Sequence, residues 1–359
     1  MKSLPVFSID LFCRVVDNFG DAGVCWRLAR QLAGEFGLTV RLLIDDIAPL
    51  RLLVPGATKG AIVDQVTICH WQQAAALQPA DCVIEAFACE LPPKYVEAMA
   101  GKPRRPVWIN LEYLSAEAWV AQHHLMPSPH PRLPLTKYFF FPGFVEKTGG
   151  LIREQWVGKE PEPSHHAGNP LQVFVFSYPN RALPGLLETW RTLAQPPHLT
   201  IADGPAGTAA LSWRTSHDVA RSLPISILPF CPQREFDALL ARHDVLFVRG
   251  EDSFIRAQWA AKPFVWHIYP QQDDAHWQKL NAFLDHYCTG MTRAAAGAVR
   301  SLWTAWNRED GSSAASAWHA FAGHLPEIRS HAGEWAMNLR KMPDLATNLV
   351  TFYQKTVKM

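Results

Sequence analysis

Two aspartates, Asp17 and Asp21, stand four residues apart in the stretch VVDNFGDAGVCWRLARQLA, just before a helical pattern. Gly20 and Gly23 allow a tight turn there, and the following helix offers unpaired N–H groups and a positive dipole end. Two extra negative charges would repel a phosphate, so the pair favours a cationic or hydrogen-bond-donating ligand. The structural alternative is that either aspartate is an N-cap, a position that this residue type prefers.

A second polar turn follows the apolar run VLFV, where the sequence reads Arg249-Gly250-Glu251-Asp252-Ser253 before another helical pattern. A strand, turn and helix in this order direct backbone N–H groups and the Ser253 hydroxyl toward one point. Arg249 adds a planar guanidinium suited to phosphate oxygens. We interpret the turn as a diphosphate cradle, although an ordinary N-cap beside a surface arginine accounts for the same residues equally well.

Aromatic residues form a third group at expected strand ends. Phe176 and Tyr178 lie in FSYPN, and Phe230, Gln233 and Phe236 lie in LPFCPQREF. Aromatic faces at a cleft can stack on a nucleobase while a glutamine reads the base edge. Taken singly, each ring is more often part of a core. Their position after strands favours ligand contact.

The cysteine and histidine patterns do not indicate a metal site. Seven cysteines are scattered without a Cys-x-x-Cys pair, which argues against a disulfide framework or structural zinc and fits a reducing compartment. The adjacent pairs His123-His124 and His165-His166 cannot turn both rings toward one site, so we expect them in solvated loops. We predict no metal.

The elements that must position these residues follow an alternating pattern, which predicts parallel sheets covered by helices. In the first helical pattern Leu28 and Leu32 share a buried face, whereas Arg27, Arg30 and Gln31 can face elsewhere. The expected strands are VFSIDLF, LTVRLLID, VTICHW, DCVIEAF, PVWINLEY and YFFFPGF in the first half, and LQVFVFSY, HLTIAD, ISILPF, DVLFVRG and PFVWHIY in the second.

The predicted fold class is α/β, with two Rossmann-like domains facing a central cleft. They comprise residues 1–155 and 168–340, joined by the polar stretch EQWVGKEPEPSHHAGNP, and a helix over residues 343–359 is expected to pack back on the first domain. Ligands of such sheets bind beyond the carboxyl ends of the strands. The architecture fits a GT-B glycosyltransferase or a hinged small-molecule-binding protein.

Length and composition agree with two ordinary domains. The chain has 359 residues, 48% of them hydrophobic, and a formal net charge of +1. The charge balance argues against a protein that coats nucleic acid or an anionic membrane. No apolar run reaches the roughly 18 residues of a membrane span, and the N-terminus is typical of a strand rather than a signal peptide. We expect a cytoplasmic protein.

The motifs VVDNFGDAGVCWRLARQL and FVRGEDSFIRAQWAAKPFVWHIYPQ together closely resemble those of the EarP family, and the similarity extends over essentially the whole chain. Members of this family are protein-arginine rhamnosyltransferases that modify bacterial translation elongation factor P. The resemblance implies an inverting GT-B enzyme that uses dTDP-β-L-rhamnose, needs no metal or cofactor, and places an α-rhamnosyl group on one arginine of the folded acceptor.

The resemblance also implies roles for particular residues. Asp17 and Asp21 match the family's acidic catalytic pair, and Glu251 matches a functionally required glutamate. The first domain would then bind the acceptor and the second the nucleotide sugar. The expected donor-binding residues are Asn18, Phe19, Gly20, Phe176, Tyr178, Phe230, Gln233, Phe236, Arg249, Gly250, Asp252, Ser253 and Tyr269.

A mechanism follows as a hypothesis. The guanidinium of arginine stays protonated, so two facing carboxylates can bind it and orient one nitrogen. We favour Asp21 as the general base and Asp17 as the positioning group, and the two roles can be exchanged. The competing predictions are another GT-B activity, such as transfer to a small molecule or epimerisation of a nucleotide sugar, and a non-catalytic nucleotide-sugar sensor.

Overall fold

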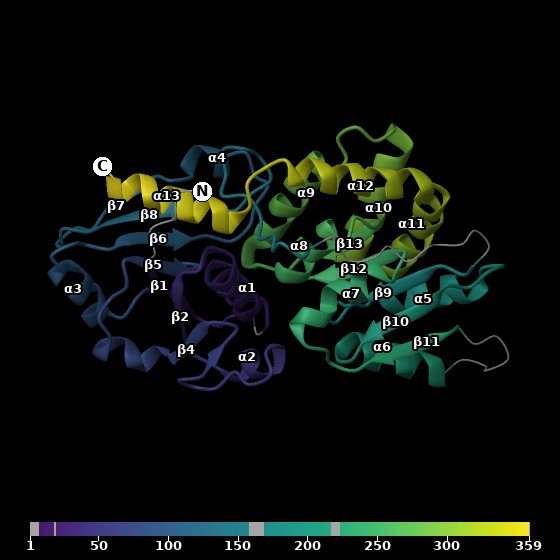
Figure 1. Ribbon diagram of the computed structural model, residues 1–359. Helices are drawn as coiled ribbons and strands as arrows, with labels where there is room; N and C mark the ends of the chain where they lie inside the picture. The colour runs from purple at the N-terminus through teal and green to yellow at the C-terminus, as the bar shows by residue number, and fades with distance from the viewer. Residues whose placement is uncertain (1–6, 18, 158–168, 217–222, 359) are drawn as a thin grey trace. The chain divides into compact units, whose positions relative to one another are not determined.

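The computed structural model describes residues 7–17, 19–157, 169–216 and 223–358. The chain divides into two compact units, one formed by Met1–Gln155 with Arg340–Met359 and the other by Trp156–Leu339. Each unit has its own sheet and its own helices (Figure 1).

The first unit contains an eight-stranded sheet in the order β3-β4-β2-β1-β5-β6-β8-β7. The pairs from β4 to β8 are parallel, and only the edge strands β3 and β7 pair antiparallel. Central strands β1, β5 and β6 are buried along almost their whole length, as their near-continuous apolar sequences predict. The strands are β1 Ser8–Cys13, β2 Thr39–Ile44, β3 Ile62–Val63, β4 Val66–His70, β5 Cys82–Ala86, β6 Val107–Leu111, β7 Pro127–Pro129 and β8 Thr136–Phe140.

The helices of the first unit are α1 Phe19–Phe36, α2 Ala48–Leu53, α3 Pro93–Gly101, α4 Val120–His123 and the C-terminal α13 Leu345–Lys358. In Figure 1 the yellow α13 lies beside β6 and β8. Leu345 and Leu349 enter the core of this unit, and the Tyr353 ring stacks on Phe7 with centroids 3.7 Å apart. Residues from both ends of the chain thus complete one core.

Helix α1 is more buried than its sequence pattern predicts. Leu28 and Leu32 are buried as expected, but Arg27 and Gln31 are also buried. The Arg27 guanidinium pairs with Glu154 through Nε at 2.8 Å and Nη2 at 2.5 Å. A buried guanidinium needs such a paired carboxylate, because desolvation of a lone charge is costly. Arg27 and Gln31 were predicted only to face elsewhere than Leu28 and Leu32, and the chain around residue 154 covers them.

Glu154 begins the stretch that we predicted as a linker, so the start of that stretch is packed structure. Residues 158–168 of the same stretch lie outside the described part of the chain.

The second unit contains a five-stranded, fully parallel sheet in the order β11-β10-β9-β12-β13. Its strands are β9 Gln172–Val175, β10 His198–Ala202, β11 Ile225–Leu228, β12 Val245–Arg249 and β13 Phe264–His267. Its helices are α5 Leu183–Thr192, α6 Pro205–Thr215, α7 Phe236–Ala241, α8 Asp252–Trp259, α9 Ala275–Tyr287, α10 Arg293–Asn307, α11 Gly311–Gly323 and α12 Leu325–Arg340. All five expected strands of this half are present.

Candidate functional site

The Asp17–Asp21 motif lies at the carboxyl end of β1, the strand paired with β2 and β5 in the first sheet. Parallel strands end at the same edge, so the segments after β5 and β6 end there as well. Residues that follow β1, β5 and β6 therefore lie close together at this edge.

Asp21 sits in the first turn of α1 and is only 2% exposed. Its Oδ2 accepts hydrogen bonds from the backbone N–H groups of Val16 and Asp17 at 2.8 and 2.9 Å. Its Oδ1 accepts one from the Tyr113 hydroxyl at 3.2 Å. These donors precede the helix, so Asp21 is not its N-cap. The carboxylate holds the loop after β1 and is itself held from both oxygens.

Asp17 is more accessible than Asp21 and is half-buried. Its carbonyl accepts from the Gly20 N–H at 2.6 Å, which closes a tight turn. A Cβ on Gly20 would lie 2.6 Å from the Asp17 Oδ2, so only glycine leaves room for this carboxylate. Phe19 and Gly20 begin α1, and the predicted donor residue Asn18 lies outside the described residues.

In the second unit, the Arg249–Ser253 turn joins β12 to α8. Gly250 has a φ of 61°, a left-handed conformation that glycine adopts without steric cost. The Ser253 hydroxyl accepts from the Arg249 N–H at 3.0 Å and donates to the Arg249 carbonyl. Trp266 Nε1 donates to the Gly250 carbonyl at 2.7 Å. The turn is thus held by contacts within the protein, and the Ser253 hydroxyl holds the turn itself.

The Arg249 guanidinium lies over two of the predicted aromatic residues. Its Cζ is 4.6 Å from the ring centroid of Phe176 and 4.7 Å from that of Tyr178. Such cation–π contacts hold the guanidinium over the two rings. Phe176 and Tyr178, which follow β9, meet Arg249 at the end of β12 because these two strands pair.

The carboxylate of Asp252 links two neighbouring side chains. Its Oδ2 accepts from Gln233 Nε2 at 3.0 Å and from Arg256 Nε at 3.1 Å, and Arg256 also pairs with Asp237 at 2.7 Å. Gln233 is buried by this contact. Glu251, the residue before α8, is partly buried.

Two other predicted aromatic residues pack against the rings that lie under Arg249. The Phe236 ring packs edge-on against Phe176 at 5.6 Å, and the Tyr269 ring packs edge-on against Tyr178 at 5.5 Å. Phe230 and Tyr269 are large apolar residues with about half of their surface open, at 52% and 46% exposed. Open aromatic faces at the end of a parallel sheet are suited to stacking on a base.

Two residues near this turn were missed by the sequence reasoning. His267 is buried beneath Tyr178, and burial lowers the pKa of its imidazole to about 4. Asn307 accepts from the Ile268 N–H at 3.0 Å and donates to the Trp266 carbonyl at 2.8 Å, which fixes the chain before Tyr269. No sequence pattern distinguishes these two from ordinary polar residues.

The expectation of a solvated loop was wrong for His123, which ends helix α4, and only partly holds for His124, which lies in the following turn and is half-buried. The Nδ1 of His124 accepts from the Phe141 N–H at 3.1 Å, and burial lowers the pKa of its ring to about 4. His165 and His166 lie outside the described residues. Within the described ranges, no group of three or more His, Cys, Asp or Glu side chains could hold a metal ion.

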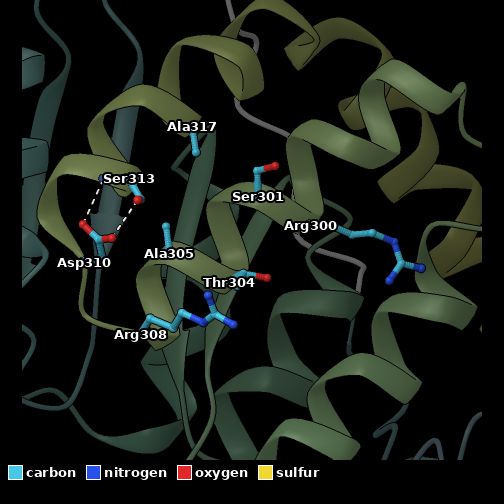
Figure 2. Close-up of a pocket in the computed structure, with 8 residues that line it drawn as sticks. All are labelled: Arg300, Ser301, Thr304, Ala305, Arg308, Asp310, Ser313 and Ala317. Carbon is cyan, nitrogen blue, oxygen red and sulfur yellow. Dashed lines mark hydrogen bonds between the residues drawn. The ribbon is translucent and has the colours of Figure 1, made fainter.

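A cavity of about 350 Å³ lies between α10 and α11 of the second unit (Figure 2). It contains none of the predicted site residues. Asp310 caps α11 there by accepting from the Ser313 N–H at 3.0 Å, and Figure 2 shows the Asp310 and Ser313 side chains turned toward each other. The lining residues are Arg300, Ser301, Thr304, Ala305, Arg308, Asp310, Ser313 and Ala317.

Comparison with known proteins identifies the family. Residues 9–354 match the model of the family described as Elongation-Factor P (EF-P) rhamnosyltransferase EarP. The chain belongs to this EarP family. It is 43% identical to the protein-arginine rhamnosyltransferase of Pseudomonas putida, with 97% of this chain and 99% of that protein covered. The enzyme of the same name from Neisseria meningitidis is 36% identical, with 99% of each covered.

Solved structures agree with this family and its fold. The chain is 32% identical to one described as the structural basis for EarP-mediated arginine glycosylation of translation elongation factor EF-P, with a TM-score of 0.67 and coverage of 97% and 99%. It also shares the fold of Acinetobacter baumannii MurG at a TM-score of 0.54 and 15% identity, with 98% and 100% covered. The predicted GT-B class is confirmed. No helix in the described part of this EarP family member is long and apolar enough to cross a membrane.

Proposed function

We propose that this protein is an inverting, metal-independent rhamnosyltransferase that transfers L-rhamnose from dTDP-β-L-rhamnose to an arginine side chain of translation elongation factor P in the cytoplasm. Full-length similarity to proteins named protein-arginine rhamnosyltransferase supports it. The observation that carries it is the Asp17–Asp21 pair, held at the sheet edge of a chain from this family. A nucleotide-sugar sensor has no chemical need for such a carboxylate pair.

On the acceptor side, the two carboxylates bind and orient the guanidinium of the substrate arginine. Asp17 is the more exposed of the two carboxylates, and it forms the charge-assisted contact that positions the guanidinium. Asp21, whose orientation is fixed by three hydrogen bonds, takes one N–H proton as the guanidinium nitrogen bonds to the anomeric carbon. The guanidinium is a poor nucleophile because it stays protonated, so a fixed base is required.

On the donor side, the turn after β12 receives the diphosphate. As the bond from the anomeric carbon to the diphosphate oxygen breaks, its electron pair leaves with dTDP, and Arg249 and the N-terminus of α8 stabilise the added charge. Phe176, Tyr178, Phe230 and Tyr269 supply faces for the base. Attack from the face opposite the leaving group inverts the anomeric configuration.

Glu251 requires a separate role. A carboxylate next to a diphosphate is unfavourable unless it points away from the phosphates. We assign Glu251 to a hydrogen bond with a sugar or ribose hydroxyl, or with a neighbouring donor that it orients. Glu251→Gln keeps the shape and removes the charge, so it separates a hydrogen-bonding role from an electrostatic one.

The test is the intact mass of purified elongation factor P after incubation with this protein and dTDP-β-L-rhamnose. One added deoxyhexose with the wild type, and a loss of about 10²-fold or more in turnover with Asp21→Asn, is the expected result. Since Asp21 also holds the loop after β1, thermal unfolding must show that the variant is folded. Normal turnover by Asp21→Asn refutes the role of Asp21 as the general base. If the wild type binds dTDP but transfers no rhamnose, the protein is instead a nucleotide-sugar sensor or has another GT-B activity.

A further inference from the structure

Beside Asp21, two aromatic residues from neighbouring strands form a stacked pair. Phe87 follows β5 and Tyr113 follows β6, and their ring centroids are 4.2 Å apart with an interplanar angle of 10°. Both rings are partly exposed. The Tyr113 hydroxyl donates to Asp21 Oδ1 at 3.2 Å. The segment after β6 therefore supplies a side chain, Tyr113, that reaches the Asp21 carboxylate, the general base of the proposed mechanism.

The loop that supplies Phe87 has an unusual backbone. Phe87, Ala88 and Glu90 have φ values of 56°, 51° and 56°, in the left-handed region that non-glycine residues rarely adopt. Such residues persist only where surrounding contacts hold them, and they concentrate at functional sites. Three of them within four positions mark this loop as a constrained part of the sheet edge.

The contacts that hold the loop come from β5, which the loop follows, and from its neighbour β6. The Phe87 N–H donates to the Leu111 carbonyl at 2.6 Å, and the Glu90 N–H donates to the Glu85 carboxylate at 3.1 Å. Asn110, fully buried in β6, accepts from the Ala88 N–H at 3.1 Å. Its other amide atom donates to Glu112, the neighbour of Tyr113, at 2.5 Å. One buried asparagine thus ties the strained loop to the segment that carries the tyrosine.

We propose that Tyr113 is a positioning residue for Asp21, and that the strained Phe87–Glu90 loop fixes the tyrosine ring through Phe87. The backbone N–H groups of Val16 and Asp17 restrain one oxygen of the Asp21 carboxylate. Tyr113 restrains the other. A carboxylate held from both sides keeps its orientation toward a bound guanidinium, which is the condition for efficient proton transfer. This inference rests on the proposed function.

The test is Tyr113→Phe, which removes only the hydroxyl and keeps the ring stacked on Phe87. We expect kcat for transfer to fall about tenfold, the scale of one lost hydrogen bond to a charged group, with the donor KM and the dTDP affinity unchanged. Phe87→Leu removes the stacking partner and should lower kcat in the same way. Tyr138→Phe, a matched control on β8 of the same sheet, should keep wild-type kcat. A kcat of Tyr113→Phe equal to that of the wild type overturns the inference.

A second measurement does not depend on turnover. In a double-mutant cycle, the unfolding equilibria of Tyr113→Phe, Asp21→Asn and the double variant report the coupling between the two side chains. We expect the two substitutions to be non-additive by a factor of about five to ten in the unfolding constant, and additive effects overturn the inference. Absence of transfer by the wild type refutes the proposed function instead, so the two failures are distinguishable.

Discussion

The indole N–H of Trp266 and the carbonyl of Gly250 lie 2.7 Å apart, so the end of β13 fixes the turn that follows its neighbour β12. The Trp266 ring also stacks on Phe254 of α8, with centroids 3.9 Å apart. Strand, turn and helix are therefore joined through one side chain. The left-handed Gly250 is held from outside the turn as well as by Ser253 within it.

Trp266→Phe should weaken dTDP binding. Phenylalanine keeps a ring against Phe254 but loses the hydrogen bond to Gly250, which is worth about 1 kcal/mol, or roughly fivefold in affinity. Isothermal titration calorimetry with dTDP measures the change. Trp303→Phe is the matched control, because the buried Trp303 Nε1 has no hydrogen-bond partner among the described residues. Equal losses in the two variants would mean that ring volume, and not the bond to the turn, determines affinity.

Gly20→Ala should lower turnover and leave dTDP affinity unchanged. The new Cβ would lie 2.6 Å from Asp17 Oδ2, which is the end of a side chain and can rotate away. The fold then tolerates the change while the acceptor carboxylate moves. We expect kcat to fall about tenfold or more, since displacing a positioning group is costly. Gly34→Ala, with no atom within 4 Å of its Cβ, is the control in the same helix and should keep wild-type turnover.

The sequence predicts the strands better than it predicts which side chains touch one another. Alternating apolar runs identified all five strands of the second sheet and the principal strands of the first, because strands buried on both faces are near-continuous in hydrophobicity. The turn at Gly250 was also predictable, since a glycine followed by capping residues between a strand and a helix has few other uses.

Contacts between distant segments could not be predicted. Arg27 is polar in a helical pattern, and only the return of the chain at Glu154 allows it to be buried. Tyr113 and Phe87 read as ordinary aromatic residues until the pairing of β5 with β6 brings them together. The Ser253 hydroxyl was predicted to face a ligand, whereas local geometry directs it to the Arg249 backbone. The contact of Ser253 with the nucleotide-sugar donor remains a prediction.

Arg249→Ala should weaken dTDP binding more than Trp266→Phe does. The substitution removes a charged donor at the diphosphate turn and the cation–π contacts with Phe176 and Tyr178. Loss of a charge-assisted hydrogen bond corresponds to about tenfold or more in affinity. Arg249→Lys should recover part of the charge but not the planar guanidinium. Calorimetric affinity that is the same in all three proteins would exclude a phosphate role for this arginine.

Protonation of His267 should make the second unit less stable in acid. Burial lowers the pKa of its imidazole from about 6.5 to about 4. The positive charge of Arg249 and the nearby His276 lower this pKa further, and the negative charge of Glu309 raises it by a smaller amount than burial lowers it. Above pH 6.5 the ring is neutral in both states. As the pH falls from 6.5 toward 4 the unfolded chain binds a proton that the folded chain does not, so stability is lost across that window.

His267→Phe should therefore reduce the loss of stability between pH 7 and pH 5. The full effect of the wild-type residue is at most about 3 kcal/mol, the size of its pKa shift. Phenylalanine preserves the edge contacts with Tyr178 and Trp306, and Nδ1 of His267 has no hydrogen-bond partner among the described residues to lose. Urea unfolding at several pH values measures how the free energy of unfolding changes with pH.

His243, whose pKa is also lowered by burial, leaves a residual pH dependence in the variant. His198→Phe, at an exposed strand position, is the control. If the free energy of unfolding of His267→Phe depends on pH as steeply as that of the wild type, the His267 ring is not neutral in the folded protein, or the surrounding structure opens before the ring binds a proton.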